Sequence, residues 1–157
     1  MVSTVKMIRW VRSWFTPDVV FDLSEGNCSI HPTRGSKESA GLDLYASCDS
    51  IRVAPGCTVI IPTGLKCSFN PGWAACLWDR SGMGAKGFHR FAGLIDSDYR
   101  GKWGVVIHNT TSEPLTVNYG DRIAQVVFQR VWIGKPKFGT VKDDTTRGTG
   151  GFGSTGK

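Results

Sequence analysis

The stretch GLIDSDYRG, residues 93–101, places an aspartate and a tyrosine directly after two apolar residues. Leu94 and Ile95 would anchor the stretch, so that Asp96 is held beside Tyr99. A carboxylate held in this way is suited to act as a general base over a planar ligand. The same residues are also good turn chemistry, and a plain hairpin tip is the alternative interpretation.

A second stretch, DRSGMGAKG at residues 79–87, combines positive charge with small residues. Arg80 and Lys86 supply the charge, whereas Ser81 and Gly82 leave backbone N–H groups open to a close approach. A short helical turn that begins near Ser81 would direct its N-terminus at an anion. A charged surface loop is the alternative.

Two strand-like stretches each carry one polar side chain opposite an apolar face. AGLDLYA, residues 40–46, alternates so that Asp43 lies on the face opposite the leucines. GDRIAQVVF, residues 120–128, does the same with Gln125. Taken alone, either residue is an ordinary solvent-facing side chain of a strand.

The chain ends in GFGSTGK, residues 151–157, which matches the beginning of a phosphate-binding P-loop. A P-loop needs a hydroxyl residue after the lysine and a helix whose N-terminus meets the phosphates, and neither follows here. The remaining interpretation is a glycine-rich tail that carries a single arginine, Arg147, and a single aromatic residue, Phe152. A solvated terminus is the alternative.

The composition limits the class of protein and of partner. A chain of 157 residues suits one domain, and its formal net charge of +6 favours an anionic partner. No apolar run approaches the roughly 20 residues of a membrane helix, so no membrane contact is expected. The five cysteines lack C-x-x-C spacing, which predicts reduced core thiols in a cytoplasmic or nuclear protein. They are Cys28, Cys48, Cys57, Cys67 and Cys76.

The secondary-structure elements that must position the candidate site residues are predicted to be strands. Short apolar runs alternate with turn signals at residues 54–56, 70–72 and 119–121, which predicts an all-β sandwich, jelly roll or barrel. The one helix candidate is SGMGAKG, at residues 81–87. The predicted strands cover residues 19–23, 42–46, 57–62, 65–69, 73–78, 104–109, 115–119 and 123–131.

The first residues differ from the rest of the chain. Residues 1–18 are basic and apolar, and we interpret them as an N-terminal extension packed on the domain or on a partner subunit. Targeting or binding to a membrane surface is the alternative. We expect a β-domain at residues 19–141 and a C-terminal segment at residues 142–157.

In order and spacing, five stretches of this chain resemble the five motifs of the trimeric dUTPases. They are AGLDLYA, RSGMGAKG, GLIDSDYRGKWGVVIHN, GDRIAQVV and RGTGGFGSTG. The resemblance runs from about residue 19 to residue 157. It implies a jelly-roll-like β-subunit with at most one short helix, assembled as a three-fold homotrimer. Each active site would lie at a subunit junction, and residues 142–157 would be a mobile arm that closes over the nucleotide.

The resemblance also implies an activity: hydrolysis of dUTP to dUMP and pyrophosphate with Mg²⁺, which keeps uracil out of DNA and supplies dUMP. Asp96 would orient and deprotonate the water that attacks the α-phosphorus. Tyr99 would lie against the deoxyribose and exclude a ribose 2′-hydroxyl. Asp43 would act on the metal through water. Backbone groups of a hairpin around residues 88–99 would read the uracil.

The remaining site residues implied by the resemblance bind the phosphates and the base. Arg80, Ser81, Gly82 and Gln125 would hold phosphate oxygens. Within the arm, Phe152 would stack on the uracil and Gly153 would let the backbone follow the triphosphate. The terminal phosphates would be held by Arg147, Ser154 and Thr155.

Two features depart from the family pattern: the extension at residues 1–18, which offers a possible extra contact, and the basic pair His89–Arg90. Three other functions stay open at this point. A catalytically silent, partner-binding relative and a dCTP deaminase would share the fold. A nucleic-acid-binding β-barrel would also use the positive charge, although we expect no stable binding of nucleic acid.

Overall fold

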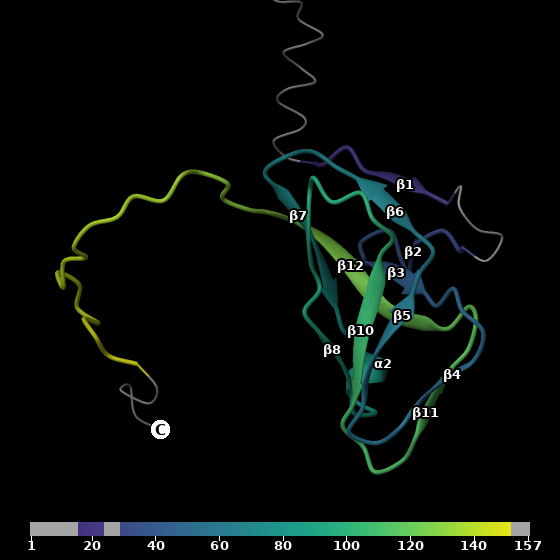
Figure 1. The fold of residues 1–157 in the computed structure, drawn as a ribbon. Helices are drawn as coiled ribbons and strands as arrows, with labels where there is room; N and C mark the ends of the chain where they lie inside the picture. Colours follow the sequence, from purple (N-terminus) through teal and green to yellow (C-terminus); the bar gives the residue numbers. More distant parts are fainter. Residues whose placement is uncertain (1–15, 24–28, 152–157) are drawn as a thin grey trace, which may run out of the picture.

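The computed structural model describes residues 16–23 and 29–151 (Figure 1). Most of the N-terminal extension and Cys28 therefore lie outside the described residues. The same holds for four of the predicted arm residues, namely Phe152, Gly153, Ser154 and Thr155.

Antiparallel strands make up almost all of the regular secondary structure of the described β-domain, in four sheets. The largest sheet has the order β2-β3-β12-β7-β9, and a three-stranded sheet has the order β5-β10-β8. Two further pairs, β1-β6 and β11-β4, extend the layers. The strands are β1 (Val20–Asp22), β2 (Thr33–Arg34), β3 (Leu42–Tyr45), β4 (Ile51–Val53), β5 (Thr58–Pro62), β6 (Lys66–Ser68), β7 (Trp73–Trp78), β8 (Phe88–Phe91), β9 (Leu94–Asp96), β10 (Gly104–Asn109), β11 (Leu115–Val117) and β12 (Arg122–Arg130).

The all-β prediction is confirmed, and each predicted run contains a strand. The helix candidate is also confirmed, as the single turn α2 (Ser81–Gly84). Sequence analysis missed β2, β4, β8 and β9, because these strands are two to four residues long and each carries at least one charged residue or histidine. A periodicity argument has too few residues to act on in such strands.

The predicted hairpin around residues 88–99 is wrong in its pairing. Among the described strands, β8 pairs with β10 and β9 pairs with β7, so the two successive strands belong to different sheets. Ala92 and Gly93 connect them, and both have a positive φ, of 58° and 99°. This tight connection, which we call the corner, carries the chain from one sheet to the other.

The core lies between the sheets, and this explains why buried and partly buried residues alternate along the strands. On β10, Val105, Ile107 and Asn109 point inward, whereas the residues between them are only partly buried. Trp103 is fully enclosed and meets the Phe21 ring edge-on, with ring centroids 5.8 Å apart. The predicted turns are also present, since Gly56, Gly72 and Gly120 all have φ near 70–80°.

The four cysteines in the described residues are free thiols. Cys67 is buried, and burial raises its pKa to about 12. Cys57 is exposed, so the prediction of core thiols is wrong for this residue, which lies in the turn before β5. No helix among the described residues is long and apolar enough to cross a membrane.

Asn109 is a fully buried polar residue that fastens the end of β10 to two loops. Its amide nitrogen donates to the carbonyl oxygens of Val53 (3.1 Å) and Glu113 (2.7 Å). Its amide oxygen accepts from the backbone and the hydroxyl of Thr111, at 3.0 and 2.8 Å.

Replacing Asn109 with alanine leaves these four partners without the side chain that satisfies them. We expect Asn109→Ala to lower the free energy of unfolding by about 2–4 kcal/mol, since each unsatisfied buried group costs about 1–3 kcal/mol. Urea denaturation measures this change. Asn118→Ala, at an exposed turn position, is the control and should change little. Equal stability of the two variants would contradict the anchoring role of Asn109.

Candidate active site

The first group of predicted site residues lies on the outer face of the five-stranded sheet. Strand register places Asp43 of β3 opposite Gln125 of β12, and Gln125 opposite Trp78 of β7. The helix α2 follows β7 after two residues. We call the resulting group the α2 cluster; it consists of Asp43, Arg80, Ser81, Gly82 and Gln125.

Electrostatics holds the α2 cluster together. The Arg80 Nε donates to Asp43 Oδ1 at 2.9 Å, and Arg122 Nη1 donates to Asp43 Oδ2 at 3.4 Å. The Asp43 side chain is largely buried between the two guanidinium groups. A carboxylate between two arginines fixes both of them. Arg80 Nη1 also donates to the Arg122 carbonyl oxygen at 3.4 Å, and the other N–H groups of the two guanidinium groups are left for an anion.

Backbone donors complete this cluster. The N–H groups of Met83 and Gly84 donate to the Arg80 carbonyl oxygen, each at 2.9 Å. The N–H groups of Ser81 and Gly82 have no acceptor among the described residues, as expected for the first turn of a helix. A Cβ at Gly82 would meet no atom within 4 Å, so the backbone is open to a ligand.

Sequence analysis did not single out three residues that support this cluster. Arg122 holds Asp43, and the Asp79 carbonyl oxygen accepts from Gln125 Nε2 at 3.0 Å. A Cβ at Gly41 would lie 2.6 Å from Gln125 Oε1, so only glycine leaves room for this glutamine. Gly41 and Arg122 both lie inside the quoted motifs, but a motif does not reveal which of its residues touch.

The second group consists of Asp96 and Tyr99, which line a cavity of about 260 Å³. Asp96 is the last residue of β9 and lies opposite Ala74 of β7. Its carboxylate is exposed, and no described residue binds it. The cavity is also lined by Ala92 and Gly93 of the corner, and we call it the Asp96 cavity.

One half of the expected anchor of Asp96 is wrong. Ile95 packs against the core, but Leu94 has 67% of its surface exposed. The reason is the alternation of β9, which puts Leu94 and Asp96 on the same outer face and Ile95 on the inner face. An exposed leucine next to an exposed carboxylate is a surface that a second molecule can cover.

The ring of Tyr99 is held by its own loop. Its hydroxyl donates to the Lys102 carbonyl oxygen at 3.2 Å, and its backbone N–H donates to the Asp96 carbonyl oxygen at 3.2 Å. A Cβ at Gly101 would lie 2.2 Å from the Tyr99 hydroxyl oxygen. Gly101 therefore allows the ring to fold back over the loop, beside the Asp96 cavity.

The two groups lie at different ends of β7. Asp96 lies opposite Ala74, whereas Gln125 lies opposite Trp78, which is four residues and about 13 Å further along the strand. A general base must be within about 3 Å of the proton that it removes. Asp96 and the α2 cluster of the same chain therefore cannot both contact one phosphate.

The described part of the C-terminal segment leaves the domain altogether. After β12 ends at Arg130, the chain runs away from the sheets (Figure 1), and almost every side chain up to residue 151 is exposed. Arg147 lies on this segment and donates through Nε to the Gly150 carbonyl oxygen at 2.9 Å. Within one chain, Arg147 contacts neither group of site residues.

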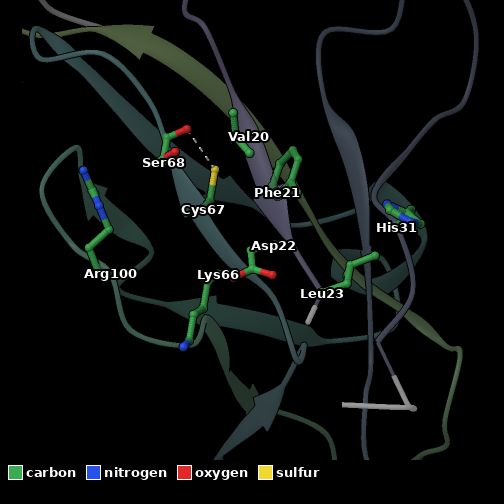
Figure 2. Close-up of a pocket in the computed structure, with 9 residues that line it drawn as sticks. All are labelled: Val20, Phe21, Asp22, Leu23, His31, Lys66, Cys67, Ser68 and Arg100. Atoms are coloured by element: carbon green, nitrogen blue, oxygen red, sulfur yellow. Dashed lines mark hydrogen bonds between the residues drawn. The ribbon is translucent and has the colours of Figure 1, made fainter. Parts of the chain in front are cut away.

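A larger cavity, of about 880 Å³, contains none of the predicted site residues. It lies beside β1 and β6, with Lys66 and Arg100 on one side and His31 on the other (Figure 2). Arg100 is turned back on its own loop, where Nη1 donates to the carbonyl oxygens of Ser97 and Tyr99. Cavity volume therefore does not identify the site in this fold.

The unexpected pair His89–Arg90 lies next to the corner. His89 Nδ1 lies 3.1 Å from Asp79 Oδ2, and the Arg90 backbone N–H donates to Asp79 Oδ1 at 2.8 Å. The guanidinium of Arg90 lies over the Trp78 ring, 5.5 Å from its centroid. Both residues thus connect β8 to the end of β7.

Comparison with known proteins identifies the family of the chain. The family model described as dUTPase matches residues 28–156. A deoxyuridine 5′-triphosphate nucleotidohydrolase of Actinobacillus pleuropneumoniae serotype 5b is 44% identical over 145 residues, which cover 88% of this chain and 95% of that protein. One from Haemophilus ducreyi is 47% identical over 133 residues, which cover 80% of this chain and 86% of that protein.

The fold comparison gives the same result. A solved structure of the Staphylococcus bacteriophage 80alpha dUTPase with dUpNHpp superposes with a TM-score of 0.80, covering 88% of this chain and 98% of that one, at 24% identity. This likeness concerns the fold, whereas the match of the family model and the curated relatives concerns the sequence. On these grounds the chain belongs to the dUTPase family.

Proposed function

We propose that this protein hydrolyses dUTP to dUMP and pyrophosphate at a site shared between subunits. The curated relatives that match most of the chain are named as nucleotidohydrolases of this substrate. The observation that supports catalysis in this chain is Asp96, an exposed carboxylate that no described residue binds, at the edge of a nucleoside-sized cavity.

In the proposed reaction, Asp96 accepts a proton from a water molecule. The oxygen of that water attacks the α-phosphorus, and the bond from this phosphorus to the β-phosphate oxygen breaks, so that pyrophosphate leaves. Asp96 is suited to this step because no arginine, lysine or backbone donor of the described chain occupies its oxygens. A carboxylate engaged in an ion pair would be a poorer base.

The α2 cluster binds the phosphates. Arg80 supplies charge-assisted hydrogen bonds, and the open N–H groups of Ser81 and Gly82 supply backbone donors. Gln125 is held with its amide nitrogen on the Asp79 carbonyl oxygen, so its orientation is fixed before the substrate binds. Preorganised donors stabilise the charge that develops on the phosphate oxygens during the reaction.

The residues present fit Mg²⁺ bound mainly by the substrate. The described residues contain no group of three or more carboxylate, histidine or cysteine side chains that could hold an ion directly. Mg²⁺ commonly keeps several waters and binds phosphate oxygens. Asp43, whose carboxylate already orients two arginines, has lone pairs left for a metal-bound water. When bound, Mg²⁺ would neutralise phosphate charge.

The Asp96 cavity receives the nucleoside. Backbone groups of the corner would read the uracil edge, and the ring of Tyr99 would lie against the deoxyribose. A ribose 2′-hydroxyl would then meet an aromatic face that offers it no hydrogen bond, which disfavours UTP.

A homotrimer is part of the proposal, because one chain does not assemble the site. The α2 cluster of one subunit would meet the Asp96 cavity of the next, and the two parts are about 13 Å apart along β7 within a chain. Exposed apolar side chains near the cavity support a subunit contact there. They are Leu94, Phe91 and Ile60.

The C-terminal segment would act as the arm of this site. Arg147 would bind the terminal phosphates, Phe152 would stack on the base, and the residues after it would enclose the phosphates. The exposed course of residues 131–151 supports this role, since the segment makes few contacts with its own domain. Closing of such an arm excludes water from the reaction.

We also propose that the protein works in a reducing compartment, the cytoplasm or the nucleus. The free thiols of the described residues support this proposal, and the exposed Cys57 most directly.

Asp96→Asn tests the general base. The variant should fold and bind nucleotide, but it should lose at least about 100-fold in kcat because the amide cannot accept the proton. Pyrophosphate release from dUTP, dCTP, dTTP and UTP, with Mg²⁺ and with EDTA, is the measurement. Asp49→Asn, an exposed carboxylate on the loop before β4, is the control and should keep full activity. Undiminished turnover of Asp96→Asn would disprove the role of Asp96.

Truncation after Thr146 tests the arm. Removing residues 147–157 should leave the fold and the oligomer intact, because no described residue of this segment contacts the sheets. The rate of dUTP hydrolysis should fall by at least about 10-fold, since the closed site is lost. Size-exclusion chromatography with light scattering checks the assembly. Full activity of the truncated protein would show that the arm assignment is wrong.

Gly41→Ala tests the position of Gln125. A Cβ here would force Gln125 away from its place between Asp43 and Trp78. We expect kcat/KM for dUTP to fall by about 10-fold, the usual scale for one displaced hydrogen-bonding group. Gly35→Ala is the matched control, because its added Cβ would meet only the Ser39 hydroxyl oxygen at 3.5 Å. Equal activity of both variants would remove Gln125 from the site.

A further inference from the structure

Arg90 occupies a position where the fold calls for an apolar side chain. On β8 it lies opposite Ile107, which is buried in the core, so the arginine points to the inner side of the sheet. Its Nε is buried and has no hydrogen-bond partner. No carboxylate among the described residues pairs with its guanidinium. A half-buried guanidinium without a carboxylate partner lowers the stability of the fold, so its other contacts should show why an arginine stands here.

The contacts that Arg90 does make hold the corner, the connection formed by Ala92 and Gly93. Its Nη1 donates to the Ala92 carbonyl oxygen, while its guanidinium lies over the Trp78 ring at 5.5 Å. A Cβ at Gly93 would lie 3.1 Å from the same Nη1. The guanidinium is therefore clamped between an aromatic ring and the peptide that joins Ala92 to Gly93.

This clamp fixes the direction of one peptide unit. In a trans peptide the C=O and the N–H groups point to opposite sides. Because the Ala92 C=O is directed to Arg90, the Gly93 N–H is directed away from it. The Gly93 N–H has no acceptor among the described residues. Ala92 and Gly93 line the Asp96 cavity, whereas Arg90 does not.

We infer that Arg90 is a positioning residue for base selection, which turns the Gly93 N–H toward the nucleobase and prevents the peptide from flipping. This inference rests on the proposed function. A backbone N–H donor suits the O4 carbonyl of uracil and opposes the N4 amino group of cytosine. A flipped peptide would present the Ala92 carbonyl oxygen instead, and that acceptor suits cytosine.

The positive φ of Ala92 is consistent with this role. A non-glycine residue with φ of 58° is disfavoured, and both residues of the corner lie in this region. Ala92 is therefore strained, whereas Gly93 adopts its φ without strain, and a peptide between two such residues has other conformations close in energy, in which it is turned over. The second carbonyl of the corner is fixed separately, since the Leu77 N–H donates to the Gly93 oxygen at 2.7 Å. Arg90 is thus the side chain that decides the orientation of the remaining peptide.

The test compares Arg90→Met with Arg90→Lys and with a matched control. Methionine keeps much of the apolar stem but cannot donate, whereas lysine keeps a cationic donor. Arg130→Met is the control, because the Arg130 guanidinium also lies 5.5 Å from a tryptophan centroid, that of Trp73, but on a residue at the end of β12. Circular dichroism and thermal melting of all three proteins check that they fold.

The readouts are kcat/KM for dUTP and dCTP, and calorimetric affinities for dUMP and dCMP. We expect Arg90→Met to lower the preference for uracil over cytosine by about 10-fold in both readouts. In the kinetic readout, the change should appear in KM more than in kcat. Arg90→Lys should restore part of the preference, and Arg130→Met should leave it unchanged.

Three outcomes would overturn the inference. An unchanged preference in folded Arg90→Met would overturn the role of Arg90 alone. A loss that is equal for uracil and cytosine nucleotides would show that the guanidinium binds phosphate or supports the fold instead. A wild-type protein that neither hydrolyses dUTP nor binds dUMP would overturn the proposed function, and the role of Arg90 with it.

Discussion

The pairing of β7 with β12 on one side and with β9 on the other is the constraint on which the candidate site depends. Backbone hydrogen bonds fix the register, so Gln125 lies opposite one end of β7 and Asp96 opposite the other. A register shift of one residue would turn either side chain into the core. The distance between the two groups is therefore a property of the sheet, and side-chain motion cannot remove it.

The electrostatic arrangement follows from the same strands. Asp43 is brought beside Gln125 by the pairing of β3 with β12, and its carboxylate then holds Arg80 and Arg122. The chain carries a net charge of +6, yet this cluster is not a field of free cations, because its arginines are oriented by an acid. Orientation of donors before binding lowers the entropic cost of holding a triphosphate.

The sequence predicted the longer strands, the turn glycines and α2, because each depends on local periodicity or on a local φ requirement. It did not predict the pairing of β8 and β9 with different partners, since pairing of short strands is decided by distant residues. The motifs named Asp43, Arg80 and Gln125, but the contact of Arg122 with Asp43 spans 79 residues of sequence and leaves no local pattern. Leu94 was misplaced because an apolar residue type does not reveal which face of a three-residue strand it occupies.

Strand β12 links the α2 cluster to the C-terminal segment. It carries Gln125 in its middle, and the segment begins where the strand ends. From Arg130 to Arg147 the chain has 17 residues, which can span about 55 Å when extended. A compact domain of this size is about 35 Å across. The segment is therefore long enough to cross a whole domain of this size, and the proposed shared site would need no rearrangement of the sheets to receive the segment as an arm. In the proposed site the sheets would set where phosphate and base bind, and the length of the exposed segment would set which site the arm can close.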